Sequence, residues 1–289
     1  METSELLKRV RQIEIKTRGL SQNIFAGQYH SAFKGRGMAF SEVREYQYGD
    51  DVRDIDWNVT ARFNKPFIKV FEEERELTLM LLIDVSGSLE FGTIRQMKKD
   101  MVTEIAATLA FSAMTNNDKI GVIFFSDKIE KFIPAKKGRK HILYIIRELI
   151  DFTPESRQTN VALGLEYLTQ VIKKRCTAFI LSDFIDEKSF KDPLTIAGKK
   201  HEVIAVQVYD RRVVELPDVG LIRVKDAENG MEQWIDTSSS KLRRMHRDWW
   251  NRSQGKIKEI FNQSNVDLTS VRTDEDYVKA LLGLFAKRN

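Results

Sequence analysis

From residue 77 onward, short apolar runs alternate with amphipathic segments, and this alternation constrains the fold more than any other feature of the chain. The first run, 77–83, is almost continuously apolar, as in a strand that is covered on both faces. Strands that alternate with helices predict a mainly parallel sheet with helices on both faces, in three layers. We expect strands at 77–83, 120–125, 178–181, 203–208 and 266–271, and an edge strand at 129–133. We expect helices at 94–114, 141–150, 161–172, 190–200, 242–261 and 277–285.

The part before residue 77 has a different character. Residues 5–18 show the spacing of a short helix, whereas residues 21–71 contain several glycines and many charges and indicate loops and short strands. We therefore divide the chain into a helix with a loop and strand segment, 1–76, and an α/β domain, 77–289. A hairpin insertion is expected at about 211–237, with its turn at Glu228-Asn229-Gly230. Five apolar side chains predict that the first segment packs on the domain: Phe40, Tyr46, Ile55, Trp57 and Phe67.

Composition excludes several classes of protein. The chain of 289 residues has a net charge of only +5, and 42% of its residues are hydrophobic, which is typical of a globular protein. No apolar run approaches the roughly 20 residues of a membrane helix, and the N-terminus lacks a signal core. One cysteine, Cys176, permits no internal disulfide. We expect a cytoplasmic protein with no membrane span, and the absence of nucleic-acid motifs beside the basic stretch 241–258 predicts that it binds no nucleic acid.

Polar residues follow two of the expected strands and precede one helix. Asp84, Ser86 and Ser88 come at the end of the first strand, Asp183 ends a later one, and Thr159 stands just before the helix that begins at residue 161. In an open parallel sheet all of these positions fall at the carboxyl edge, where ligands bind. The fold class therefore predicts that five residues from three distant segments converge.

These residue types suit a divalent cation. Mg²⁺ prefers oxygen ligands in an octahedron, and hydroxyls with two carboxylates supply neutral and negative oxygens in a ratio that balances its charge. The alternatives Mn²⁺ and Ca²⁺ also accept such oxygens. A cation with mostly neutral direct ligands retains an affinity for one more anion, which a partner's carboxylate can supply.

The pattern Asp84-x-Ser86-x-Ser88, Thr159, Asp183 resembles the metal-ion-dependent adhesion site of von Willebrand factor A domains, with all five positions filled. The stretches Phe33 to Phe40, Gly49 to Arg53, Ile55-Asp56-Trp57 and Phe71 to Glu76 resemble the family called domain of unknown function 58. That resemblance covers about 13–285 and implies a family segment joined to an A-like domain. It also implies partnership with bacterial AAA+ ATPases of the MoxR type. Asn160 departs from the family, in which an aspartate is more usual.

Other readings of the same residues stay open. Asp84, Ser86 and Ser88 also suit a strand-to-helix turn with capping hydroxyls, or a site that keeps its ligands without holding metal. A Mg²⁺-dependent phosphotransferase of the haloacid dehalogenase type would use an aspartate two positions after Asp84, where this chain has Ser86. The surroundings of Ser86 lack the Gly-x-Ser-x-Gly of hydrolases. We therefore expect a metal-dependent binding module and no enzyme, with a Mg²⁺-dependent hydrolase or phosphotransferase as the alternative.

Charges of alternating sign gather between Gly49 and Arg62. They either satisfy one another while the segment docks, or they form a surface for a partner. The candidates for partner contact are Arg53, Asp56, Trp57 and Arg62. The partner that the resemblance implies is the MoxR-type ATPase or its client protein.

Overall fold

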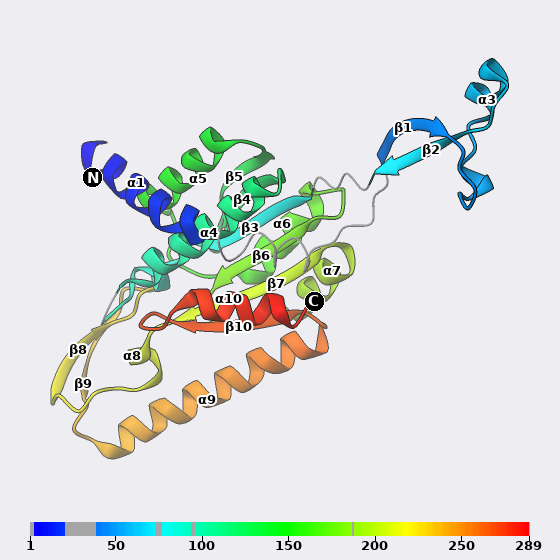
Figure 1. Ribbon diagram of the computed structural model, residues 1–289. Helices are drawn as coiled ribbons and strands as arrows, with labels where there is room; N and C mark the ends of the chain where they lie inside the picture. The colour runs from blue at the N-terminus through cyan, green and yellow to red at the C-terminus, as the bar shows by residue number, and fades with distance from the viewer. Residues whose placement is uncertain (1–2, 21–38, 73–76, 94–95, 187, 289) are drawn as a thin grey trace. The chain divides into compact units, whose positions relative to one another are not determined.

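The computed structural model describes residues 3–20, 39–72, 77–93, 96–186 and 188–288. The chain divides into two compact units, of which the smaller comprises Phe33–Leu77 and the larger comprises residues 1–32 and 78–289. Figure 1 shows the elements of each unit.

A six-stranded sheet forms the centre of the larger unit, with the order β10-β7-β6-β3-β4-β5. Every neighbouring pair is parallel except β4 and β5, which are antiparallel. The expected mainly parallel sheet is therefore confirmed, and each strand lies within a few residues of its expected place. The bounds are β3 (Thr78–Asp84), β4 (Lys119–Phe125), β5 (Ile129–Lys136), β6 (Thr177–Ser182), β7 (Glu202–Tyr209) and β10 (Asp267–Arg272).

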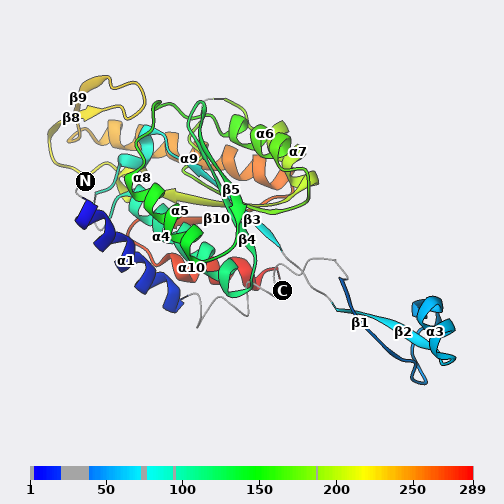
Figure 2. The same ribbon diagram turned by 90° about the horizontal axis from the view of Figure 1, so that it is seen from above.

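Helices cover both faces of this sheet, as Figure 2 shows. Helices α4 (Lys98–Thr115), α5 (Arg139–Asp151) and α10 (Tyr277–Ala286) lie on one side. Helices α6 (Val161–Val171), α7 (Lys191–Lys200) and α9 (Ser240–Gln263) lie on the other. Alternate side chains of β3 point to opposite faces of the sheet. On one face, Met80 and Leu82 belong to the core cluster that includes Leu165, Leu194 and Phe261. The expected three-layer α/β architecture is confirmed.

Helix α4 is buried on nearly all sides, because α1 (Thr3–Leu20) covers the surface that the sheet leaves free. Small residues such as Ala106 and Ala110 allow this close packing. Ion pairs tie α1 to its neighbours: Arg9 contacts Asp100 at 2.6 Å, and two similar bridges join Lys16 to Glu104 and Arg139 to Glu14. Helix α1 thus belongs to the larger unit, and the compact units divide the chain at points other than residue 76.

The start of α4 corrects the sequence expectation. The helix begins at Lys98 and not at residue 94, since Gln96 and Met97 are not helical. The amide of Lys98 donates to the carbonyl of Phe91 at 3.0 Å, which closes a loop immediately before the helix. The apolar periodicity of 94–114 does not predict where the helix begins, because Met97 fits the helical pattern although it lies before the first turn.

The smaller unit pairs β1 (Ala39–Glu45) with β2 (Phe67–Glu72) in antiparallel orientation. Between them lie the 3₁₀ turn η2 (Val52–Asp54) and the short helix α3 (Trp57–Phe63), which the sequence expectation of loops and strands omits. Asp56 caps α3, since its carboxylate accepts from the amides of Asn58 and Val59. The part of the expectation that covers 21–38 lies outside the described residues. The packing of this segment on the larger unit stays a prediction.

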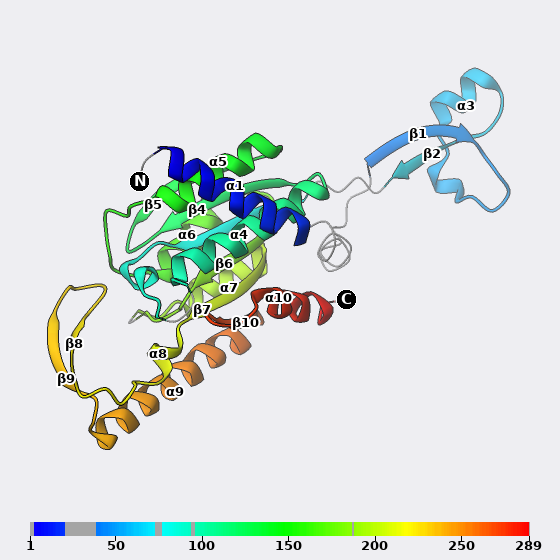
Figure 3. The ribbon, with the colours of Figure 1, turned by 60° about the vertical axis from the view of Figure 1, so that its left-hand side comes forward.

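An antiparallel hairpin follows β7 and the short helix α8 (Arg211–Val214). Its strands are β8 (Leu221–Lys225) and β9 (Glu232–Asp236), which lie within the range 211–237 where the sequence predicts a hairpin. Figure 3 shows the hairpin standing apart from the six-stranded sheet. Thr237 fixes its base, because the Thr237 hydroxyl donates to the carbonyl of Gly220 at 2.6 Å and accepts from the amide of Val219 at 3.1 Å.

Cys176 lies buried just before β6, with its Sγ 3.4 Å from Nδ1 of His201. Burial raises the pKa of the Cys176 thiol to about 12. A buried thiol with a raised pKa is unreactive.

Candidate metal centre

Strands β3 and β6 lie side by side in the sheet, and both end at the carboxyl edge. The chain leaves β3 through α4 to reach β4 on one side of it, whereas β6 and β7 lie on the other side. The boundary between β3 and β6 is therefore a topological switch point, the place where ligands bind in open α/β sheets. Asp84 ends β3, and Asp183 directly follows Ser182, the last residue of β6.

Asp84 is fully buried, and both of its carboxylate oxygens are occupied. Oδ1 accepts from the amide of Ser86 at 2.9 Å, and Oδ2 accepts from the hydroxyl of Ser182 at 2.6 Å. Burial, followed by the negative charge of Asp183, raises the pKa of Asp84 to about 6.

Ser86 and Ser88 follow in a tight loop. Their hydroxyl oxygens are 3.2 Å apart, and the 3₁₀ turn η3 (Gly87–Glu90) holds them in this arrangement. The amide of Gly87 donates to the carbonyl of Arg157 at 2.9 Å, so this loop is tied to the segment that carries Thr159. Backbone contacts thus bring two of the three predicted segments together.

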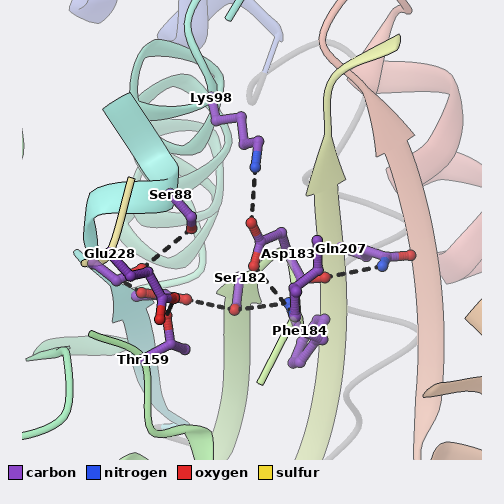
Figure 4. A network of polar contacts seen from close by, with 11 residues as sticks. Ser88, Lys98, Thr159, Ser182, Asp183, Phe184, Gln207 and Glu228 are labelled. Atoms are coloured by element: carbon purple, nitrogen blue, oxygen red, sulfur yellow. Dashed lines mark hydrogen bonds and ion pairs between the residues drawn. The ribbon is translucent and has the colours of Figure 1, made fainter. Parts of the chain in front are cut away.

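Asp183 forms a buried ion pair with Lys98, the first residue of α4 (Figure 4). Lys98 Nζ lies 2.7 Å from Asp183 Oδ2, and the two side chains are only 3% and 1% exposed. The other carboxylate oxygen accepts from the amide of Ile185 at 3.2 Å. Phe184 adopts a left-handed conformation with φ of 57° and packs against Phe261, which turns the chain sharply after Asp183.

Thr159 completes the predicted set. Its hydroxyl donates to Oε1 of Glu228, in the turn of the hairpin, at 2.7 Å (Figure 4). Burial is the main cause that raises the pKa of Glu228, and the charge of Asp183 adds to it, so Glu228 lies close to the same cluster. The neighbouring Asn160 caps α6 by accepting from the amide of Leu163 at 3.1 Å, which gives the departure from the family pattern a local structural role.

The donor set fits a divalent cation. Asp84 and Asp183 bring two carboxylates to the site, Asp183 also acts electrostatically on Glu228, and Lys98 pairs with Asp183. The hydroxyls of Ser86, Ser88 and Thr159 add neutral oxygens, which hard cations such as Mg²⁺ accept. Within the described ranges no three His, Cys, Asp or Glu side chains converge as a metal cluster, so such a site depends on the hydroxyls. The role of these residues as metal ligands stays a prediction.

The four candidates for partner contact lie in the smaller unit. Trp57 is 70% exposed, and Arg53 lies on the surface with its Nε 3.7 Å from Asp51. Asp56 has a structural role as the cap of α3, and its carboxylate lies 3.6 Å from Lys69 Nζ. Arg62 is exposed in the last turn of α3. Their role in binding a partner stays a prediction.

Sequence reasoning missed Lys98, Ser182, Gln207 and Glu228. Ser182 carries a detectable signal, because a polar residue at the end of an otherwise apolar strand next to Asp183 indicates a buried hydrogen bond. Gln207, which donates from Nε2 to the carbonyl of Asp183 at 3.0 Å, is likewise a polar residue within an apolar strand. Lys98 and Glu228 carry no such signal, since a charged residue at a helix start or in a turn is usually exposed.

The fold and the cluster define an α/β domain whose carboxyl edge gathers hydroxyls and carboxylates from separate segments. The chain belongs to the family described as "Protein of unknown function DUF58", whose model matches residues 42–255. The uncharacterized protein Rv1480 of Mycobacterium tuberculosis (strain ATCC 25618 / H37Rv) is 29% identical over 290 residues, which cover 98% of this chain and 90% of that protein. The uncharacterized protein YeaD of Bacillus subtilis (strain 168) is 28% identical over 172 residues, or 58% of this chain and 39% of that protein.

Solved structures resemble the chain at low sequence identity. The conserved hypothetical protein BatB from Bacteroides thetaiotaomicron has a TM-score of 0.47 and 13% identity over 73% of this chain and 98% of its own. The SpRpn10 VWA domain has a TM-score of 0.37 and 10% identity over 74% of this chain and 96% of its own. Among the described residues, no helix combines the length and the apolar character needed to cross a membrane.

Proposed function

We propose that the chain is a non-enzymatic, divalent-metal-dependent protein-binding module that acts in the cytoplasm. The observation that carries this proposal is the convergence of two buried carboxylates and three hydroxyls at the switch point of the sheet. The partner proposed from the family resemblance is a MoxR-type AAA+ ATPase or its client protein. Mg²⁺ is the proposed ion, with Mn²⁺ and Ca²⁺ as alternatives.

The residues of the site have two proposed roles: some hold an ion, and others orient the side chains that hold it. The proposed ligands are Asp84, Ser86, Ser88, Thr159 and Asp183. A cation bound there supplies positive charge that attracts a partner's carboxylate. Ser182 orients Asp84 through its hydroxyl, and Gln207 holds the backbone at Asp183. Such supporting hydrogen bonds fix the direction of the ligand oxygens before an ion arrives.

The second candidate, a Mg²⁺-dependent hydrolase or phosphotransferase, has less support. Ser86 occupies the position where the phosphotransferase chemistry requires an aspartate. None of the three histidines within the described residues hydrogen-bonds Ser86; they contact Ile120, Cys176 and Val213 instead. Turnover of a generic phosphate ester in the presence of Mg²⁺, lost in Asp84→Ala, would favour this candidate over the binding module.

Calorimetric titration with Mg²⁺ or Mn²⁺ tests the metal site. We expect one site in the wild type and no binding by Asp84→Ala, whereas the control Asp192→Ala, which alters an exposed carboxylate on α7, should bind normally. Equal heats in the wild type and Asp84→Ala would contradict the proposal.

Binding of the partner is tested by capturing a MoxR-type ATPase on the tagged protein, with and without EDTA. Ser88→Ala should weaken capture as EDTA does, because it removes a half-buried hydroxyl without leaving a buried charge unpaired. Asp183→Ala is less suitable, because it would also leave the buried Lys98 ammonium without its partner. A complex that survives both EDTA and Ser88→Ala at full affinity would show that the metal edge is not the interface.

A further inference from the structure

The turn of the β8–β9 hairpin lies against the loop that carries Ser86 and Ser88. A Cβ atom added to Gly87 would stand 2.1 Å from the carbonyl oxygen of Ala227, closer than any side chain tolerates. The hydroxyl of Thr159 contacts Glu228 in the same turn at 2.7 Å. Two separate contacts therefore place this turn, residues 226–230, over the carboxyl edge where the proposed ligands converge.

The turn holds Glu228 in a fixed direction. Asp226 Oδ1 accepts from the amides of Glu228 at 2.9 Å and Asn229 at 3.0 Å, and the amide of Gly230 donates to the Asp226 carbonyl at 3.0 Å. Gly230 has φ of 73°, a conformation that a residue without Cβ adopts at no steric cost. Asn229 Oδ1 closes the far side by accepting from the amide of Met231 at 2.8 Å. These hydrogen bonds hold the turn in one conformation, which directs Glu228 toward the site.

We propose that Glu228 is an internal ligand of the metal site, occupying the position that a partner's carboxylate takes when the hairpin turn moves aside. This inference rests on the metal-dependent binding proposed above and adds to it a named occupant for the open position. A partner with an acidic side chain then binds by exchanging its carboxylate for that of Glu228.

The charges around Glu228 support this assignment. Glu228 is half-buried, the carboxylates of Asp183, Asp226 and Asp186 act on it as like charges, and the hydroxyl of Thr159 donates a hydrogen bond to it. A half-buried carboxylate placed among other carboxylates is unfavourable unless a cation offsets them. A divalent cation held by Glu228 together with the proposed ligands would supply that charge.

The hairpin also has features that allow a partner to displace it. It has only two strands, and such a hairpin is marginally stable on its own. Several of its large apolar side chains face solvent, so their burial does not hold the hairpin in place; Leu221, Met231 and Trp234 are 63%, 71% and 66% exposed. Met231, which directly follows the turn, offers a partner an exposed apolar side chain there.

Metal titration of Glu228 variants tests the proposal. We expect Glu228→Ala and Glu228→Gln to weaken Mg²⁺ binding by at least about 10-fold, because loss of a ligand should cost no less than loss of a group that only orients ligands. The matched control Glu232→Gln alters another carboxylate of the same hairpin, which pairs with Arg223, and should leave the affinity unchanged. Hydrogen exchange of the amides in 226–230 should slow on addition of Mg²⁺ in the wild type but not in Glu228→Gln.

Chemical rescue separates this inference from the proposed function. Sodium acetate should restore Mg²⁺ affinity to Glu228→Ala, where the carboxylate and its space are vacated, but not to Glu228→Gln, whose amide fills that space. Asp84-dependent Mg²⁺ binding that is unchanged in both Glu228 variants would overturn the internal ligand and leave the metal site intact. Absence of Mg²⁺ binding in the wild type would overturn both.

Discussion

Replacing Lys98 by methionine tests whether its ammonium and a divalent ion share Asp183. The Lys98–Asp183 pair has exposed fractions of 3% and 1%, so it belongs with buried ion pairs and not with the weak pairs of protein surfaces. Removing one partner of a buried pair costs about 3–5 kcal/mol, because the other charge stays buried without compensation. Methionine retains most of the apolar stem, so we expect a loss near the lower end, about 3 kcal/mol, in metal-free protein.

Mg²⁺ should reverse much of this loss. In Lys98→Met the ion meets Asp183 without a competing ammonium, so it should bind more tightly than to the wild type and stabilise the variant more. Saturation to 100 times the dissociation constant adds about 2.7 kcal/mol to the free energy of unfolding. Urea denaturation in EDTA and in excess Mg²⁺, for both proteins, measures the difference between the two stabilisations.

Lys131→Met is the matched control, because Lys131 pairs with Glu148 at 2.6 Å in a partly exposed position away from the site. Its effect on the free energy of unfolding should be smaller and independent of Mg²⁺. An equal loss of stability for Lys98→Met with and without Mg²⁺ would refute the sharing of Asp183. An unchanged urea midpoint in EDTA would refute the stabilising role of the buried pair itself.

Two further predictions concern the site and the sheet. The pKa of Asp84 is raised to about 6 in the folded protein, so Mg²⁺ must displace its proton at low pH: affinity should rise from pH 5 to pH 7. Calorimetry in buffers of different ionisation enthalpy should show about half a proton released from Asp84 at pH 6 and almost none at pH 8, and equal release at both would contradict this. Gly121→Ala should destabilise the protein by roughly 1–3 kcal/mol in urea denaturation, because the new Cβ would lie 2.8 Å from Met80 Sδ and 2.9 Å from the Ile133 carbonyl oxygen. Gly255→Ala, in α9 with no atom within 4 Å, should instead stabilise it by about 0.5–1 kcal/mol, and loss of stability there would refute the comparison.

The four central strands β3, β4, β6 and β7 were predictable because they are almost entirely buried and therefore largely apolar. The burial pattern of β6 shows this most clearly, since all its residues from Thr177 to Ser182 are buried. Helix α3 escaped prediction because its seven residues are too few to show a helical period, although Asp56 ahead of it has the residue type of a cap. The start of α4 at Lys98 depends on the loop after Phe91, which periodicity does not report.

The five candidate ligands could be placed at one edge from the sequence, because their positions at strand and helix ends follow from the fold class. The residues that contact these ligands could not be predicted from the sequence. Lys98 reaches Asp183 across 85 positions of sequence, and Glu228 reaches Thr159 across 69. Both contacts depend on how a helix start and a hairpin pack against the sheet edge, and local residue patterns carry no information about such packing.

The buried cysteine has a practical consequence for spectroscopy. Cys176 is the only cysteine of the chain, and burial against His201 keeps its thiol protonated and shielded from reagents. A thiol introduced at an exposed position of the hairpin, as in Met231→Cys, would therefore be the single reactive one, without prior removal of a native thiol. A spin label or fluorophore attached there could follow the hairpin in an otherwise unaltered chain, on the microsecond to millisecond timescale of segment motions.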